Sequence, residues 1–290
     1  MVTTPITAEG LPSVKSSGRV LILLDGSRTS LAALEAAAEI ALARNAEVLG
    51  VFVEEVNLLR SAGYGFASEV GGSSGLLRPL EVEVLEARMR ALAEQARRAL
   101  EQVMLRRGVA QALRLCRGRV AEEVLGLIGP DDLVVMGRVG WSAIPGCRLG
   151  STAGVLIHQA PGDVLLWSTS PPLARNRVVV LLNHDQGANH RAVRVGAELA
   201  RRHQQPLTVL IRAEALEDQQ VVEDVRAYLK AEGISARVRL LAMTGVASVV
   251  RAMAEEGAAQ LVVSRKFSLF GGQGADILLT ELNLPVTVTA

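Results

Sequence analysis

Residues 133–151 read Leu133-Val-Val-Met-Gly-Arg-Val-Gly-Trp-Ser-Ala-Ile-Pro-Gly-Cys-Arg-Leu-Gly-Ser151 and carry the strongest structural signal of the chain. The first four residues are apolar and predict a buried strand. Gly137, Gly140 and Gly150 then interrupt the chain until a helical pattern begins at Ser151. Glycine lets main-chain N–H groups approach a ligand where a Cβ would block it, and the N-terminus of a helix attracts anions. These residues therefore predict a phosphate cradle between a strand and a helix.

The spacing of the glycines, Gly-x2-Gly-x9-Gly-Ser, differs from that of the common nucleotide-binding loops. A Walker loop ends in Gly-Lys-Ser or Gly-Lys-Thr, and the dinucleotide fingerprint reads Gly-x-Gly-x-x-Gly. Neither pattern occurs in the sequence. The predicted cradle is therefore of another type.

Strands and helices alternate on both sides of this cradle. Apolar runs predict strands at 20–24, 48–53, 112–115, 133–136 and 164–167, and helical periodicity predicts helices at 31–44, 81–107, 119–127 and 151–158. Residues 57–79 are rich in glycine and serine and predict a long loop without regular elements, either a functional lid or a disordered segment. Strands that are apolar on both faces predict a parallel sheet covered by helices on each side.

The same order of elements then begins again. Residues 177–182 repeat 19–24, and Leu261-Val-Val repeats Leu133-Val-Val. We therefore predict a flexible tail at 1–17, a first domain at 18–168, a linker at 169–176 and a second domain at 177–290. The predicted fold class is α/β, with two tandem doubly wound parallel-sheet domains of five strands each in the order 3-2-1-4-5.

This topology also predicts where a ligand binds. In open α/β sheets the ligand lies beyond the carboxyl ends of the strands, where the strand order reverses. In the order 3-2-1-4-5 the reversal falls between the first and fourth strands, whose carboxyl ends are Asp25 and Gly137. Topology and glycine spacing therefore predict the same site.

The cradle glycines with Ser151, and Asp25-Gly-Ser after the first strand, together resemble the ATP-binding type of the universal stress protein family. The resemblance covers nearly all of the chain and implies an adenine-nucleotide alpha-hydrolase-like fold. It implies that Asp25 and the main chain around Val53 lie near the adenosine, and that a Mg²⁺ ion bridges the phosphates of bound ATP. The remaining ATP-binding residues that it implies are Met136, Gly137, Gly140, Gly150, Ser151 and Thr152.

Two residues of the predicted site have a second interpretation. Arg138 departs from the pattern of many relatives; like Arg148, it either pairs with phosphate oxygens, and so belongs to the ATP-binding set, or is a solvated surface arginine. Asp25 either contacts the ribose or caps the helix that starts near Ser27 to Ser30, and the two roles can coexist.

The second copy departs from the cradle pattern. In an alignment without gaps, Arg265 and Ser268 stand opposite Gly137 and Gly140. An arginine at the first glycine position is expected to fill the space that a triphosphate needs. We therefore predict that the second copy binds no ATP.

Composition excludes several classes of partner. The 31 Lys and Arg residues nearly cancel the 30 Asp and Glu residues, so we expect no attraction to nucleic acid or to an anionic membrane. Two cysteines indicate a reducing compartment and hence the cytoplasm, and neither a signal peptide nor a run of about 18 apolar residues is present. His184 and His190 have no third ligand nearby, so no metal site is predicted.

We therefore expect a cytoplasmic stress-response protein in which ATP bound to the first domain alters a surface for an unidentified protein partner. No convincing general base lies beside the motif, which favours binding over catalysis, and no catalytic residue is assigned. One alternative is a slow ATPase or self-phosphorylating enzyme that uses Ser151, Thr152 or Asp25. Another is a binding module for a different adenylate or metabolite.

The resemblance also implies association through the last strand of each domain. Residues 164–167 and 286–288 are expected to pair within the chain, which makes a pseudo-dimer and hides two sheet edges. Dimerisation of whole chains stays open.

Overall fold

The computed structural model describes residues 18–71, 74–140, 149–168, 176–182, 186–212, 218–241, 245–271 and 274–290. The predicted tail at 1–17 and all but the last residue of the predicted linker lie outside these residues. The strands of the described residues form one ten-stranded sheet and one two-stranded sheet.

Elements up to residue 167 form what we call the first half. In chain order they are β1 (Val20–Leu23), α1 (Arg28–Arg44), β2 (Val48–Glu55), α2 (Val56–Ala62), β3 (Ser68–Val70), β4 (Leu77–Pro79), α3 (Val82–Arg107), β5 (Gln111–Gly118), α4 (Val120–Leu125), β6 (Leu133–Gly137), α5 (Ser151–Gln159) and β7 (Asp163–Trp167).

Elements from residue 177 onward form the second half. They are β8 (Arg177–Leu182), α6 (Gln186–Arg202), β9 (Leu207–Arg212), α7 (Asp218–Ala231), β10 (Arg237–Leu241), α8 (Val246–Glu255), β11 (Ala258–Ser264), the 3-10 helix η1 (Ser268–Gly271), α9 (Gly274–Glu281) and β12 (Val286–Thr289).

The two halves have the same sheet topology. The ten strands lie in the order β10-β9-β8-β11-β12-β7-β6-β1-β2-β5, so each half shows the predicted order 3-2-1-4-5. In the ten-stranded sheet the strands within each half are parallel, whereas β12 and β7 pair antiparallel with Thr287 opposite Leu165. The predicted pairing of the two last strands within the chain is therefore confirmed, and it turns two sheets into one.

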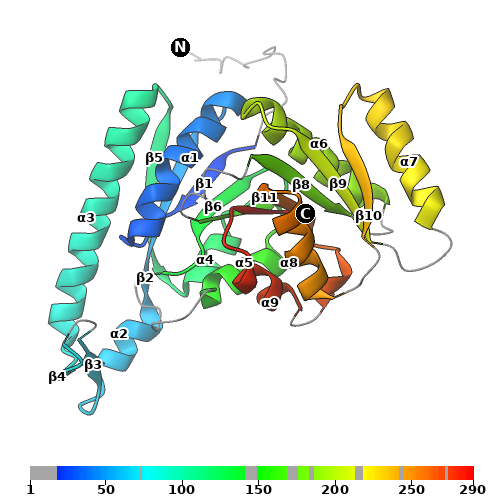
Figure 1. Ribbon diagram of the computed structural model, residues 1–290. Helices are drawn as coiled ribbons and strands as arrows, with labels where there is room; N and C mark the ends of the chain where they lie inside the picture. The colour runs from blue at the N-terminus through cyan, green and yellow to red at the C-terminus, as the bar shows by residue number, and fades with distance from the viewer. Residues whose placement is uncertain are drawn as a thin grey trace, which may run out of the picture.

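Helices cover both faces of this sheet (Figure 1). On one face, α1 and α3 pack on the first half and α6 and α7 on the second, over two separate apolar clusters. On the other face, residues of α4, α5, α8 and α9 belong to one buried cluster that runs across both halves. In the described part of the chain no helix is long and apolar enough to cross a membrane.

Local signals explain where the long helices begin and end. The Ser27 hydroxyl accepts a hydrogen bond from Ser30 N at 3.1 Å and so caps α1. Asn45 ends α1 at φ 50°, and Gly108 ends α3 at φ 66°, in the left-handed region that terminates many helices.

The prediction that residues 57–79 form a loop without regular elements is wrong. They contain most of α2 and the hairpin of β3 and β4, with Ser68 opposite Pro79. Figure 1 shows this hairpin at the end of α3 that lies away from the sheet. The glycines of this segment lie between these short elements and do not prevent them, because the hairpin needs only three residues in each strand.

Candidate functional site

A cavity of about 690 Å³ opens at the carboxyl ends of β1, β2 and β6, where the strand order reverses. Its walls come from β1, α1, β2, α2, α3, α4, β6 and α5 and from residues next to them. All nine residues predicted for the nucleotide line this one cavity: Asp25, Val53, Met136, Gly137, Arg138, Gly140, Gly150, Ser151 and Thr152.

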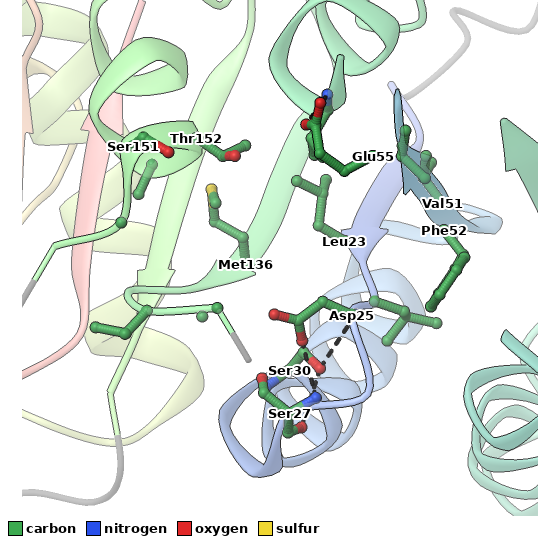
Figure 2. Close-up of a pocket in the computed structure, with 18 of the residues that line it drawn as sticks. Leu23, Asp25, Ser27, Ser30, Val51, Phe52, Glu55, Met136, Ser151 and Thr152 are labelled. Carbon is green, nitrogen blue, oxygen red and sulfur yellow. Dashed lines mark hydrogen bonds between the residues drawn. The ribbon is translucent and has the colours of Figure 1, made fainter. Parts of the chain in front are cut away.

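The turn between β1 and α1 forms one wall. Asp25 follows β1, and its Oδ1 accepts a hydrogen bond from Ser27 N at 2.9 Å. The N-cap of α1 is Ser27, so the interpretation of Asp25 as the cap is wrong, because Asp25 supports the turn that precedes the cap. This turn holds the carboxylate in the wall of the cavity (Figure 2).

The opposite wall is the segment that leaves β6 and the start of α5. Gly150 N donates to Arg138 O at 2.7 Å, which ties the end of the cradle loop to its beginning. Gly150 is the N-cap of α5 and offers no side chain, so none caps the first N–H groups of the helix. These N–H groups and the hydroxyls of Ser151 and Thr152 place hydrogen-bond donors along this wall, which is the chemistry that an anion site requires.

The cradle glycines are close to neighbouring groups. A Cβ on Gly140 would lie 3.0 Å from Asp25 Oδ2, and a Cβ on Gly137 would lie 2.9 Å from Thr29 Oγ1. Both positions therefore have little room for a side chain. The Thr29 hydroxyl itself donates to Val139 O at 3.2 Å and so connects α1 to the cradle loop.

The floor of the cavity is apolar and lies between these two polar walls. Leu23 and Met136 lie between the Asp25 side and the Ser151 and Thr152 side in Figure 2, with Val51 further along the sheet. A flat apolar ring fits such a floor, while its polar substituents reach the walls.

Several lining residues were not predicted. Leu58 and Ser61 come from α2, and Met89 and Leu92 come from α3. The helical periodicity of α3 marked its apolar stripe but not which part of that stripe faces a cavity. Residues of α2 were missed because the segment was interpreted as a loop.

Glu55 is a further unpredicted lining residue, at the end of β2. Its carboxylate accepts hydrogen bonds from Asn57 N at 3.1 Å and from Val120 N at 3.2 Å. It therefore supports the first turns of both α2 and α4. An acidic residue directly before a helix is the signal that could have identified this role.

The side chain of Arg138 neither points to a phosphate position nor lies in solvent, which were the two interpretations of this residue. Arg138 is among the lining residues, but its buried guanidinium donates to the main-chain carbonyls of Leu279, Leu282 and Leu284 in the second half. Burial lowers the pKa of Arg138 to about 10. Pairing with phosphate oxygens and exposure to solvent are therefore both wrong for its side chain, because the end of α9 attracts the guanidinium. Arg148 lies outside the described residues.

The sheet register corrects the alignment of the two copies. Val164 and Val286 occupy equivalent places in the antiparallel pair of β7 and β12, and each lies beside the fourth strand of its own half. The register makes these pairs equivalent: Val134 and Leu261, Gly137 and Ser264, Arg138 and Arg265, and Gly140 and Phe267. The alignment without gaps was wrong by one position, because runs of apolar residues buried on both faces do not fix a register.

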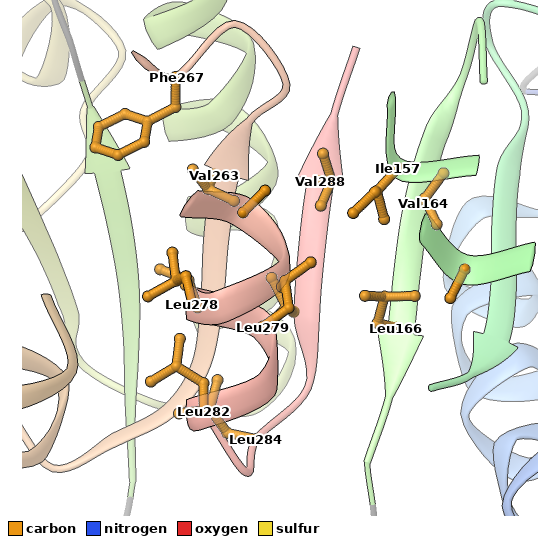
Figure 3. Close-up of a cluster of buried hydrophobic side chains, with 14 of the residues drawn as sticks. Ile157, Val164, Leu166, Val263, Phe267, Leu278, Leu279, Leu282, Leu284 and Val288 are labelled. Carbon is orange, nitrogen blue, oxygen red and sulfur yellow. The ribbon is translucent and has the colours of Figure 1, made fainter. Parts of the chain in front are cut away.

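The second half therefore departs from the cradle pattern through a different residue than the expected Arg265. Phe267, at the place of Gly140, is 1% exposed and belongs to the buried cluster (Figure 3). Arg265 does not fill a phosphate space but donates to Ile157 O at 2.7 Å and to Gly162 O at 3.0 Å in the first half. His190 stacks on the ring of Tyr228 with centroids 4.1 Å apart, and His184 lies outside the described residues.

Comparison with known proteins agrees with the fold and identifies a family. The profile of the universal stress protein family matches residues 17–167. A universal stress protein from Archaeoglobus fulgidus DSM 4304 superposes with a TM-score of 0.71 at 16% identity and covers 94% of this chain and 96% of its own. A putative universal stress protein from Pseudomonas aeruginosa UCBPP-PA14 gives 0.58 at 15%, covering 93% and 92%. No curated protein shows significant sequence similarity to the chain. Because the family profile spans more than half of its length, the chain belongs to the universal stress protein family.

Proposed function

We propose that the first-half cavity binds ATP and that the chain is a tandem universal stress protein with one competent nucleotide site. The observation that carries this proposal is the meeting of nine residues, distant in sequence and predicted for one ligand, around one cavity. The second half is then a degenerate copy, in which the buried Phe267 replaces a cradle glycine. A domain boundary between residues 168 and 177 belongs to the same proposal.

The cavity suits each part of an adenine nucleotide. The start of α5, the main chain at Gly140 and Gly150, and the hydroxyls of Ser151 and Thr152 offer donors to phosphates. The apolar floor suits a planar base, and Asp25 suits ribose hydroxyls. A volume of about 690 Å³ is within the range of small-ligand sites, roughly 300–1,000 Å³.

A Mg²⁺ ion is compatible with this site. Asp25 and Glu55 are the carboxylates among the lining residues, and both accept hydrogen bonds from main-chain N–H groups. Mg²⁺ is commonly held by one or two carboxylates, substrate phosphates and water. Asp25, at the cradle, is the carboxylate that would hold the ion, whose role would be to neutralise phosphate charge.

Regulated binding of a protein partner in a stress response is the proposed role of the nucleotide. Leu58 and Ser61 connect the cavity to α2, and α2 leads directly into the hairpin of β3 and β4. This part of the molecule exposes apolar side chains that have no role in the core: Tyr64, Phe66, Val70, Leu76 and Leu77. Such a patch is typical of interaction sites. A ligand that contacts α2 would change how this patch is presented.

Calorimetric titration with MgATP tests the site. We expect one site per chain in the wild-type protein and no saturable binding in Gly140→Asp, because a carboxylate at that position meets Asp25 and occupies the cradle. The matched control is Gly65→Asp, which adds the same charge where a Cβ has no heavy atom within 4 Å. Two sites would contradict the degenerate second half, and no binding would overturn the proposal.

Hydrogen exchange of residues 56–71 and 74–80 tests the regulatory role. Saturating MgATP is expected to slow amide exchange in α2 of the wild-type protein and to leave Gly140→Asp unchanged. Slowed exchange confined to the cradle, with α2 unaffected, would show that the nucleotide does not act on the hairpin.

A further inference from the structure

One residue touches both the cradle and the second half. Arg138 follows the last residue of β6, and its carbonyl accepts the hydrogen bond from Gly150 N that closes the cradle. Its side chain leaves the cavity wall and ends among the carbonyls of Leu279, Leu282 and Leu284. A shift of its main chain at the cradle therefore moves its guanidinium, and a shift of the guanidinium at the end of α9 moves its main chain.

These carbonyls lie at a place that attracts a cation. Leu279 is in the last turn of α9, and Leu282 and Leu284 follow the helix before β12. Carbonyls in the last turn of a helix have no partner within it, and the helix dipole puts partial negative charge there. The guanidinium thus caps α9 from the other half.

The electrostatic environment of Arg138 is incomplete. Arg138 is 8% exposed and forms no ion pair with a carboxylate among the described residues, and its Nε has no hydrogen-bond partner. Carbonyl dipoles compensate its charge only in part, as the lowered pKa indicates. An anion bound to the cradle would supply a full opposite charge beside the same residue.

We propose that Arg138 couples a phosphate-bearing ligand in the first-half cavity to the end of α9 in the second half, so that each stabilises the other through one positioning residue. This inference rests on the proposed nucleotide site. Linkage requires reciprocity: if the seated guanidinium strengthens ligand binding, the bound ligand must hold α9 more firmly by the same factor. The second half then senses occupancy of the first without having a ligand of its own.

The equivalent arginine provides a matched control. Arg265 crosses in the opposite direction and caps α5 through Ile157 O and Gly162 O, but it does not line the cavity. Arg265→Met therefore removes the same type of contact between the halves and leaves the cradle residues in place. A purely structural role would make the two methionine variants alike.

Calorimetry with MgATP on the full-length chain is the first test. Arg138→Met is expected to weaken binding by about tenfold, a typical coupling factor. Arg138→Lys, which keeps the charge but loses the planar fork, is expected to be intermediate, and Arg265→Met to stay within about threefold of wild type. Equal affinity in all variants, or equal losses in the two methionine variants, would overturn the coupling while leaving the ATP site established.

Hydrogen exchange of the unaltered protein is the second test and needs no variant to fold. MgATP is expected to slow exchange of residues 274–286, which lie more than 100 residues beyond the cradle in sequence. In Arg138→Lys this effect is expected to be reduced or absent. Unchanged exchange in this segment at saturating MgATP would overturn the coupling. Absence of MgATP binding to the wild-type protein would overturn the nucleotide site and the coupling together.

Discussion

Arg138 and Arg265 occupy equivalent positions in the two halves, and each guanidinium caps the last helix of the other half. The acceptors are equivalent as well. Leu165 and Thr287 face each other in the pair of β7 and β12, and Ile157 lies as many residues before Leu165 as Leu279 lies before Thr287. The halves are therefore joined by one pair of strands and a shared apolar cluster (Figure 3), and also by two reciprocal arginines. In each half, the cap of the last helix is therefore an arginine that the other half supplies.

Loss of one reciprocal arginine should weaken the whole chain. Arg265→Met leaves the carbonyls of Ile157 and Gly162 without a donor. We expect the free energy of unfolding to fall by about 1–3 kcal/mol, measured by urea denaturation. The control is Arg98→Met on α3, where the side chain is 74% exposed and a change within about 0.5 kcal/mol is expected. Equal effects would contradict the capping role.

Phe267 should be a principal support of the second half. It is fully buried, so Phe267→Ala leaves a cavity and is expected to cost about 3–5 kcal/mol of unfolding free energy. Phe66→Ala removes the same ring where the residue is 85% exposed and should change stability by less than about 0.5 kcal/mol. A small loss for Phe267→Ala would mean that the ring does not fill the place of the lost cradle.

Gly26 should tolerate no side chain. Its φ of +77° is unfavourable for other residues, and a Cβ would lie 2.5 Å from Cδ2 of Leu92. Gly26→Ala is therefore expected to lower the free energy of unfolding by more than about 1 kcal/mol in thermal or urea denaturation. Gly65→Ala, where a Cβ has open space, is expected to be neutral or slightly stabilising. The reverse order would show that the turn after β1 relaxes easily.

Asp132 should make the free energy of unfolding decrease as the pH falls in the acidic range. Burial raises the pKa of this carboxyl, but hydrogen bonds from the Arg19 side chain and from the N–H groups of Gly129 and Arg19 outweigh burial and lower it below 3.8. A group whose folded-state pKa is lowered stabilises the fold above its unfolded pKa, and this stabilisation is lost as the pH falls through the folded value.

Asp132→Asn tests this sign. The variant is expected to be less stable than wild type by about 1–3 kcal/mol at pH 7, and the difference should shrink below about pH 4. Urea denaturation at pH 7, 5 and 3.5 measures it, with the exposed neighbour variant Asp131→Asn as control. A difference that is constant over this range would show that the charge of Asp132 is not the cause.

Local sequence patterns predicted most of the regular elements. The helix of residues 81–107 and the four-residue apolar run of β6 were found within a residue or two, because periodicity reports burial directly. The pattern missed α2 and the hairpin of β3 and β4. Their strands have three residues each and are largely exposed, so they show no alternation of buried and exposed side chains.

The cavity residues at the ends of β1 and β6 and at the start of α5 were predictable for a similar reason. Asp25 follows β1 and Gly137 ends β6, and these adjacent parallel strands fix the main chain at their ends. Glycines and a helix N-terminus then act through main-chain groups, whose positions follow from the order of elements alone.

The sequence by itself determined the alternation of strands and helices, the strand order of each half and nine of the residues that line the cavity, because short-range periodicity and sheet topology specify main-chain positions. Only the tertiary structure decided the register between the copies and where the side chains of Arg138 and Arg265 end. A long guanidinium is placed by the nearest unpaired carbonyls, and here those belong to a helix more than 100 residues away, brought close by the antiparallel pairing of β7 and β12.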